Sequence, residues 1–309
     1  MMNEYIIGDN LEVLDTITDN FDFVYIDPPY NTGRNFGDFD DKFLNTEEFI
    51  NFLRPRIQKI YEKLNETGNL VLHVDPIASH YCKVMLDEIF GIKNFQNEII
   101  WCTNGMKKVK TKIMRSHDVL LVYSKKKTKA YFKPMYEPHV LKVGKKYKDD
   151  GTGRGPYNTS AAVNSQPNVI IRLNLRYEWM GNHRQWWVSK EKMQELHDDN
   201  RLEYNAKKIP RIKRYYAELA GIPLKDVWTD IKSIQIGEKM DYATQKPIKL
   251  IERLLHLYTK ENDNCLDFFA GTGVLGRACN KINPKRNYLL IDINEDGKKL
   301  FEGSIKTNE

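Results

Sequence analysis

Short apolar segments alternate with helical segments at both ends of the 309-residue chain, and this alternation limits the possible folds more than any other feature. Apolar runs predict strands at residues 5–8, 21–26, 69–74, 98–101, 119–123, 265–268 and 288–291. Amphipathic spacing predicts helices at residues 11–17, 46–65 and 77–90. It also predicts one helix that begins at residue 247, a separate helix that ends near residue 281, and a short helix at the C-terminal end. Such alternation is typical of an α/β fold with a doubly wound, mostly parallel sheet.

The middle of the chain lacks this regularity. Residues 125–170 are rich in Lys, Gly, Pro and Tyr, and helices are predicted only at residues 189–198 and 213–220. Because sheet elements lie on both sides, we expect one core with an inserted region. The core would comprise residues 1–130 and 225–309, and the insertion residues 131–224. A long irregular stretch within a compact domain usually has a function.

Charge is concentrated in this middle region. Residues 101–150 contain 14 Lys and Arg against 4 Asp and Glu, and residues 151–224 contain 12 against 7. The first 100 residues are acidic, with 8 basic against 18 acidic side chains. A basic block beside an acidic core indicates a polyanion-binding insertion, although a solvated lysine-rich surface would give the same counts.

Several protein classes are excluded by simple features. No apolar run approaches the roughly 20 residues that cross a bilayer, and Glu4 stands where a signal peptide would be basic, so we expect neither membrane insertion nor secretion. The four cysteines have no metal-ligand spacing. We therefore expect reduced cysteines and no metal site.

A glycine-rich loop, Asp267-Phe-Phe-Ala-Gly271-Thr-Gly273, follows the strand at residues 265–268. Its glycines allow a ligand to approach the backbone closely. Asp292 ends the next strand, where an acid can accept hydrogen bonds from ribose hydroxyls. The pattern indicates a nucleotide-type cofactor site, and a tight structural turn is the alternative. A P-loop is excluded because no Lys-Ser or Lys-Thr follows the glycines.

The tetrapeptide Asp27-Pro28-Pro29-Tyr30 stands where a buried strand ends, and open α/β sheets bind ligands at such carboxyl ends. Asp27 supplies an acceptor, the prolines fix the backbone so that carbonyls can point outward, and Tyr30 supplies a flat face for stacking a base. Two acceptors could bind the exocyclic amine of a nucleobase and direct its lone pair at a methyl donor. A capped turn with Tyr30 as packing is the alternative.

Together these segments resemble the β-class amino-group DNA methyltransferases, which include the modification subunits of type III restriction systems. The resemblance spans nearly the whole chain. In that class the Asp-Pro-Pro-Tyr segment precedes the glycine loop, as position 27 precedes position 267 here. The resemblance implies a permuted, Rossmann-like methyltransferase fold with S-adenosylmethionine as cofactor.

The resemblance also implies roles for particular residues. Catalysis would fall to Asp27, Pro28, Pro29 and Tyr30. Asp9 would bind the adenine of the cofactor, Gln245 and Lys246 would lie near its methionine end, and Asp292 would hold its ribose. The complete set of expected cofactor-binding residues is Asp9, Asn10, Gln245, Lys246, Pro247, Asp267, Phe268, Phe269, Gly271, Thr272, Gly273 and Asp292.

A target base in a duplex must be flipped out to reach the methyl donor. The basic insertion is the expected DNA reader, because phosphate contacts from Lys and Arg dominate affinity. Its expected DNA-binding residues are Arg154, Lys207, Lys208, Arg211, Lys213 and Arg214. The tryptophans Trp179, Trp186 and Trp187 are expected to form the core of the insertion.

These observations favour a sequence-specific methyltransferase that acts on the N6 amine of adenine in double-stranded DNA. Asp27 favours adenine, since relatives that modify cytosine N4 more often have Ser there. Cytosine N4 methylation, RNA methylation, a DNA-binding protein with an inactive core, and a modification subunit of a restriction complex are the alternatives. We expect double-stranded DNA as a partner. A second copy of the chain and a cognate restriction endonuclease are further candidate partners. The expected location is the cytoplasm, in association with DNA, for a protein encoded by a prokaryote or phage.

Overall fold

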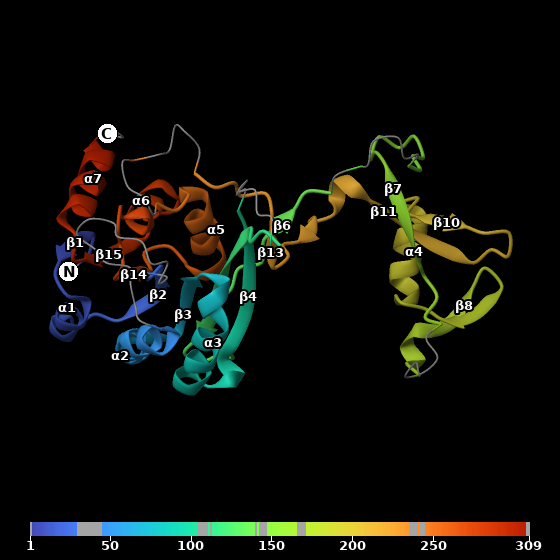
Figure 1. The fold of residues 1–309 in the computed structure, drawn as a ribbon. Coiled ribbons are helices and arrows are strands. Elements are labelled where there is room, and N and C mark those ends of the chain that lie inside the picture. Colours follow the sequence, from blue (N-terminus) through green and yellow to red (C-terminus); the bar gives the residue numbers. More distant parts are fainter. Residues whose placement is uncertain are drawn as a thin grey trace. The chain divides into compact units, whose positions relative to one another are not determined.

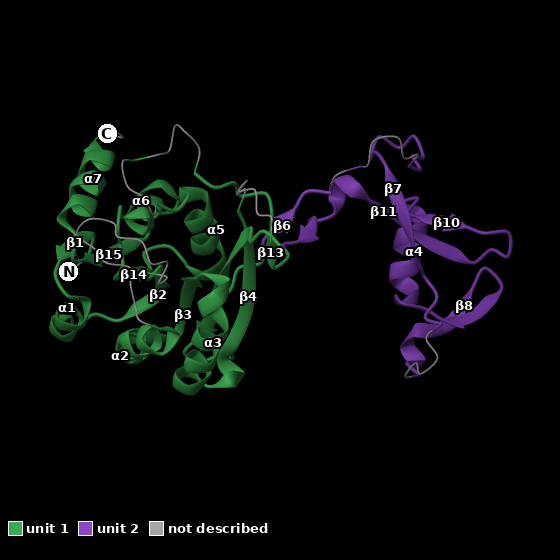
Figure 2. Cartoon of the chain, in the orientation of Figure 1, with its two compact units in different colours: residues 1–134, 225–309 green, residues 135–224 purple. Residues whose placement is uncertain are grey.

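The computed structural model describes residues 2–29, 45–103, 111, 113–139, 141, 147–165, 171–234, 240 and 245–306. Within it, the chain forms two compact units, which Figure 2 distinguishes by colour. Unit 1 comprises residues 1–134 and 225–309, and unit 2 comprises residues 135–224. The expected boundaries of the insertion were 131 and 224. The first and last described residues, 2 and 306, both belong to unit 1 (Figure 2).

Unit 1 is built on an eight-stranded sheet with the order β1-β15-β14-β2-β3-β5-β4-β13. Its strands are β1 (Glu4–Ile7), β2 (Phe21–Ile26), β3 (Leu64–Val74), β4 (Phe95–Cys102), β5 (His117–Ser124), β13 (Val227–Trp228), β14 (Asn264–Asp267) and β15 (Asn287–Asp292). Among the described strands of this sheet, only β5 runs antiparallel to its neighbours β3 and β4, and the other pairs are parallel. The mostly parallel sheet predicted from the sequence is thus confirmed.

Helices cover both faces of this sheet (Figure 1). Helices α1 (Asn10–Thr16), α2 (Thr46–Lys63) and α3 (Pro76–Phe90) pack on one face, where their apolar side chains join one large core cluster. Helices α5 (Ile248–Tyr258), α6 (Val274–Lys281) and α7 (Glu295–Lys306) contact one another in sequence, α5 with α6 and α6 with α7. The single-turn 3-10 helix η1 (Ile92–Asn94) precedes β4.

The boundary between α2 and β3 differs from the prediction. The helix was expected to reach residue 65 and the strand to begin at residue 69, but α2 ends at Lys63 and β3 begins at Leu64. Gly68 lies inside the strand, where its carbonyl accepts a hydrogen bond from the Lys125 backbone N–H at 3.2 Å. Pairing with neighbouring chain segments therefore overrides the turn preference of this glycine.

Unit 2 contains three small sheets. Strands β10 (Leu202–Tyr204), β11 (Pro210–Tyr215) and β7 (Tyr157–Ala161) form an antiparallel sheet, while β8 (Arg176–Trp179) pairs with β9 (Asn182–Gln185) and β6 (Tyr136–Glu137) with β12 (Ile222–Pro223). Helix α4 (Lys190–Asp198) confirms the helix predicted at 189–198, with Ser189 as its cap. The 3-10 helices η2 (Leu173–Leu175) and η3 (Tyr216–Glu218) complete the unit.

A small core holds unit 2 together. It consists of Ala162, Trp179, Trp186, Met193, Leu202 and Ile212. The prediction that tryptophans form this core is confirmed for Trp179 and Trp186, but Trp187 is 50% exposed. The prediction of a helix at residues 213–220 is wrong, because β11 and η3 occupy that segment. Cross-strand pairing on both sides of β11 outweighs the local preference for a helix.

Asp150 is the centre of a partly buried polar cluster in unit 2. One of its oxygens accepts hydrogen bonds from the Lys213 ammonium and the Tyr215 hydroxyl, each at 2.6 Å, and the other accepts from the Thr152 hydroxyl at 2.7 Å. The Asp150 and Lys213 side chains are only 12% and 7% exposed. The hydrogen bond from Lys213, followed by that from Tyr215, lowers the pKa of Asp150 well below its ordinary value.

This cluster predicts an acid-sensitive unit 2. A carboxylate whose pKa is depressed by folding stabilises the fold above its unfolded pKa of 3.8, and this contribution is lost as the pH falls further. We expect Asp150→Asn to lower the melting temperature at pH 7. Below about pH 4, the melting temperature of this variant should fall less steeply with pH than that of the parent. Tryptophan fluorescence during heating at several pH values would measure this. An Asp150→Asn protein that matched the parent at every pH would contradict it.

Candidate active site

Four parallel strands bring their carboxyl ends to one edge of the sheet. In the order β1-β15-β14-β2, these ends are followed or formed by Asp9, Asp292, Asp267 and Asp27. The sequence separates Asp27 from Asp267 by 240 positions, yet their strands are neighbours. The fold therefore gathers the two predicted motifs, catalytic and cofactor-binding, at one edge.

Lys246 forms an ion pair with Asp27. Its ammonium donates to Asp27 Oδ2, and the two side chains are 11% and 15% exposed. Pro247 is the first residue before α5, and the Gln245 side-chain oxygen accepts from the Met240 N–H at 2.8 Å. The resemblance had placed Lys246 near the methionine end of a cofactor, whereas its ammonium here contacts the carboxylate of Asp27, which is expected to be catalytic. Sequence analysis did not foresee this pair.

The two prolines after Asp27 differ in exposure, with Pro28 buried and Pro29 partly buried. Tyr30 lies outside the described residues, as do Thr244 and the basic residues 107, 108, 110 and 112.

Asp292 holds the glycine loop directly. Its Oδ2 accepts from the Gly271 N–H at 2.7 Å and its Oδ1 from the Asn294 N–H at 3.0 Å. On the other side, the Tyr5 hydroxyl donates to the Gly271 carbonyl at 2.7 Å. Burial raises the pKa of Asp292 even though these N–H groups oppose the rise. The N–H and the carbonyl of Gly271 are thus both held by side chains, from β15 and β1 respectively.

Gly273 is required for two reasons. It has a φ of +66°, in the left-handed region, and it caps α6. A Cβ placed there would lie 2.4 Å from Phe301 of α7. Thr272, between the glycines, is 3% exposed. Part of the glycine pattern predicted for a cofactor therefore serves the packing of the loop against α7.

Asp267 is the most deeply buried acid of the group, at 1% exposure. Its Oδ1 accepts from the Phe269 N–H at 3.0 Å. Burial, with added repulsion from Asp27 and Asp292, raises its pKa well above the ordinary value. The adjacent Phe268 is fully buried in the core cluster shared with α1, α2 and α3. Phe268 thus turns its side chain into the core, and its expected place among the cofactor-binding residues stays a prediction, whereas Phe269 is only partly buried.

Asp9 and Asn10 are fixed by a residue that sequence analysis missed. Asp9 Oδ1 caps α1 by accepting from the N–H groups of Leu11 and Glu12, at 2.8 and 3.4 Å. The Arg56 guanidinium of α2 contacts both Asp9 and Asn10. The signal was present, because Arg56 occupies the apolar stripe formed by Phe49, Leu53, Ile57 and Ile60. A charged side chain at such a position requires buried partners.

A second missed feature is a buried hydrogen-bonded chain across β2, β3 and β5. The Tyr25 hydroxyl lies 2.9 Å from His73 Nδ1, and His73 Nε2 lies 3.2 Å from Asp118 Oδ2. Burial, followed by the charge of Lys246, lowers the pKa of His73. A neutral imidazole that donates to Asp118 must accept from Tyr25, so the tautomer follows from the partners. Tyr25 stands two residues before Asp27.

The expected DNA-binding residues lie in unit 2. Lys207 and Lys208 are exposed in the turn between β10 and β11, and Arg211 and Arg214 are exposed on β11. Because side chains alternate along a strand, Arg211 and Arg214 point to opposite faces of the sheet. The expectation that Lys213 contacts DNA is corrected, because this residue is 6% exposed and its ammonium pairs with Asp150. Arg154 is paired with Asp199 at 2.5 Å.

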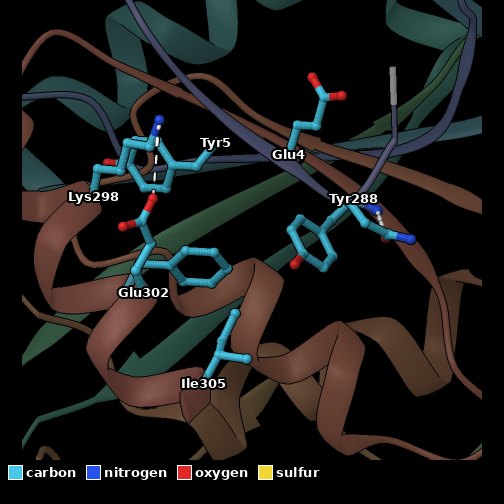
Figure 3. A pocket seen from close by; sticks show the side chains of 8 residues that line it. Glu4, Tyr5, Tyr288, Lys298, Glu302 and Ile305 are labelled. Atoms are coloured by element: carbon cyan, nitrogen blue, oxygen red, sulfur yellow. Dashed lines mark hydrogen bonds and ion pairs between the residues drawn. The ribbon is translucent and has the colours of Figure 1, made fainter.

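A hollow of about 410 Å³ lies near the amino ends of β1 and β15 in unit 1, and Figure 3 shows the side chains that line it. It is lined by Asn3, Glu4, Tyr5, Tyr288, Lys298, Phe301, Glu302 and Ile305. Asn3 and Tyr288 stand at the amino ends of their strands, whereas the predicted site stands at the carboxyl ends. Of the expected cofactor and catalytic residues, none lines it.

Comparison with known proteins identifies the family. A family model described as DNA methylase, covering N6 and N4 enzymes, matches residues 21–302. The chain belongs to this DNA methylase family. Within the described residues, no helix of this methylase has the length and apolar character needed to span a membrane, and its four cysteines are free thiols.

Curated relatives of this DNA methylase include type II methyltransferases and Mod subunits of type III restriction-modification enzymes. The type II methyltransferase M.KpnI of Klebsiella pneumoniae is 27% identical over 90% of this chain and 76% of the relative. The StyLTI Mod subunit, a type III restriction-modification enzyme of Salmonella typhimurium, is 25% identical over 95% of this chain. That alignment spans only 52% of the Mod subunit, so the chain covers about half of its length.

Solved structures support the methylase fold. The complex of M1.HpyAVI with SAM has a TM-score of 0.51 at 18% identity, with 97% of this chain and 98% of that chain covered. A putative DNA modification methylase from Thermus thermophilus, complexed with S-adenosyl-L-methionine, has a TM-score of 0.52 at 17% identity, covering 97% and 92%. At these identities the likeness shows the fold.

Two glycines of α7 provide a matched test of the glycine loop. A Cβ on Gly297 would lie 2.3 Å from the Gly271 carbonyl oxygen, whereas a Cβ on Gly303 would meet nothing within 4 Å. We expect Gly297→Ala to displace Gly271 and to raise the Kd for S-adenosylmethionine about tenfold or more. Gly303→Ala should leave the Kd unchanged. Isothermal titration calorimetry would measure both, and equal Kd values would contradict the role of this contact.

Proposed function

We propose that the chain is a β-class, sequence-specific DNA methyltransferase. It transfers a methyl group from S-adenosylmethionine to the N6 amine of a flipped adenine in double-stranded DNA. The observation that carries this proposal is the placement of Asp27, followed by the buried Pro28, at the same sheet edge as the glycine loop and Asp292. Family membership supplies the reaction class, and the residue Asp27 favours adenine over cytosine.

The chemistry follows from the acceptors at this edge. An exocyclic amine is a poor nucleophile because its lone pair is delocalised into the ring. The Asp27 carboxylate and the Pro28 carbonyl could each accept one of its N–H groups, which would localise the lone pair and aim it. The Lys246 ammonium holds the Asp27 carboxylate in place before the amine arrives. Tyr30 would stack on the base.

The residues present fit S-adenosylmethionine. When bound, it supplies an electrophilic methyl group on a positively charged sulfur. Asp292 braces the glycine loop, because its carboxylate accepts from the Gly271 N–H at 2.7 Å. The buried carboxyl groups of Asp267 and Asp292 suit a cationic ligand, since positive charge nearby would offset the burial that raises their pKa. Asp9 and Phe269 would hold the adenosine end, which Asn10 would support through its hydrogen bond to the Phe268 carbonyl, and Gln245 and Lys246 would hold the methionine end.

Unit 2 would bind the DNA. The exposed cations Lys207, Lys208 and Arg211 form the proposed phosphate-contacting surface, with Arg214 on the opposite face of β11. Arg211 is held in place by Thr159, whose hydroxyl and carbonyl accept from the guanidinium at 2.8 and 2.9 Å. A preorganised guanidinium loses less entropy on binding a phosphate. Lys213 is not part of this surface.

Partners and location follow as further proposals. Exposed apolar residues Ile77, Tyr81 and Val84 lie at helical spacing on α3, at 67%, 58% and 58% exposure, which supports self-association into a homodimer. Similarity to Mod subunits supports a cognate restriction endonuclease as partner. Action on prokaryotic or phage DNA would place the protein in the cytoplasm.

The product identifies the target base. We would incubate the protein with S-adenosylmethionine and unmethylated genomic DNA, digest to nucleosides, and use mass spectrometry. N6-methyl-deoxyadenosine is expected. N4-methyl-deoxycytidine would overturn the base assignment and keep the mechanism, and it is a real alternative because a cytosine-N4-specific methyltransferase, PvuII, shares the fold with a TM-score of 0.50. Methylation of RNA but not of duplex DNA would overturn the proposal that duplex DNA is the substrate.

The catalytic role of Asp27 gives a direct prediction. Asp27→Ala should reduce turnover by several orders of magnitude, because the amine loses its charged acceptor, while cofactor affinity stays close to that of the parent. Single-turnover methylation and calorimetry with S-adenosylmethionine would measure the two effects. Near-normal turnover in this variant would show that another group activates the amine.

The proposed DNA surface predicts a change in salt dependence. Lys207→Glu with Lys208→Glu should weaken DNA binding and flatten the slope of log K against log salt, because fewer counterions are released. Lys192→Glu, in α4 of the same unit, is the control, since its ammonium already pairs with Glu195 at 2.6 Å. Fluorescence anisotropy at several salt concentrations would measure the slope. An unchanged slope in the double variant would move the DNA surface elsewhere.

A further inference from the structure

Arg56 is a buried cation at the edge of the candidate cofactor site. It lies in α2 and is 8% exposed. Each nitrogen of its guanidinium has its own acceptor. Nε donates to Asn10 Oδ1 at 2.7 Å, Nη1 to the Phe52 carbonyl at 2.9 Å, and Nη2 to Asp9 Oδ2 at 3.3 Å. No motif of the family resemblance included it.

One arm of this network reaches the glycine loop. Asn10, whose side-chain oxygen accepts from Arg56, uses its amide nitrogen to donate to the Phe268 carbonyl at 3.0 Å. Asn10 is only 6% exposed, so both ends of its amide are satisfied inside the protein. The Phe268 carbonyl belongs to the peptide that leads into Phe269. Arg56 therefore fixes the backbone just before the loop at Gly271.

The apolar side of Arg56 reaches the same place. Its guanidinium lies over the Phe52 ring, 3.8 Å from the centroid, and Phe52 packs on Phe269 with ring centroids 6.1 Å apart. The Phe269 ring is thus supported by a side chain that Arg56 itself covers. Two independent routes, one polar and one aromatic, connect Arg56 to the residues 268–269.

The other arm reaches the acid after β1. Asp9 Oδ1 is committed to capping α1, and Oδ2 accepts from Arg56. In the sheet, β1 and β14 are not neighbours, because β15 lies between them. A single guanidinium on α2 therefore links two walls of the candidate site that the sheet does not join directly.

Only an arginine can make this set of contacts. Its planar fork offers donors in several fixed directions, whereas a lysine ammonium is a single point on a flexible stem. Burial lowers the pKa of Arg56, and the charge and hydrogen bond of Asp9 oppose this. The site thus keeps a charged guanidinium at a buried position where an apolar side chain would fit the stripe of α2.

We propose that Arg56 is a positioning residue for the cofactor site, which sets the Asp9 carboxylate and the Phe268–Phe269 segment in the geometry that binds S-adenosylmethionine. The inference rests on the proposed function, because it takes these two walls as the adenosine-binding part of the site. Arg56 acts through Asp9, Asn10 and Phe52.

The test compares two arginines of α2. Arg56→Lys keeps the charge and removes the fork, and Arg54→Lys is the matched control, because Arg54 is 35% exposed and pairs with Glu88 at 2.6 Å. For Arg56→Lys we expect the Kd and KM for S-adenosylmethionine to rise about tenfold. The kcat at saturating cofactor and the KM for DNA should stay near the parent values. Arg54→Lys should match the parent throughout.

A second variant keeps the proposal testable if Arg56→Lys fails to fold. Asn10→Asp retains the acceptor for Arg56 and loses the donor to the Phe268 carbonyl, so it should also raise the Kd for S-adenosylmethionine. Calorimetry without DNA separates the possible failures. A parent protein that does not bind the cofactor would overturn the proposed function. A parent that binds, with both variants folded and equal to it, would overturn the role of Arg56.

Discussion

Four acidic side chains meet at the carboxyl edge of β1, β15, β14 and β2, and the candidate site depends on how their charges are balanced. Each acid has its own counterpart. Asp27 pairs with Lys246 and Asp9 with Arg56, while Asp292 and Asp267 accept backbone N–H groups. The last two have raised pKa values, because N–H groups offset burial less than a full charge does. The two carboxyl groups that are held by backbone N–H groups thus stand on either side of the glycine loop in the sequence.

The two faces of the central sheet are used differently. Residues Val24, Ile26, Leu70, Leu72 and Leu121 turn to α1, α2 and α3 and form the main core. Alternating with them, Tyr25, His73 and Asp118 form a polar chain across three strands. Because neighbouring residues in a strand point to opposite faces, the same strands supply the apolar core on one face and the polar groups near Asp27 on the other.

Much of this fold was predictable, and the limits have physical causes. Continuous apolar runs such as residues 21–26 predict buried strands, and the acids and glycines that follow them predict the site. The predicted helix at 213–220 failed because Ile212 and Tyr215 are buried through pairing with strands distant in sequence. Arg56, His73 and the Lys246–Asp27 pair were missed for a related reason. Their partners are set by tertiary contacts, which local patterns do not contain.

Among the described strands, β1 pairs with β15 alone. During synthesis β1 is made well before this partner, and it cannot form the pairing until residues 287–292 have left the ribosome. Strand β14, between β15 and β2, is also made late. The half of the sheet from β2 to β5 can assemble early, whereas the edge that carries the glycine loop closes last. A ribosome-bound chain would thus acquire its core well before it acquires a complete site.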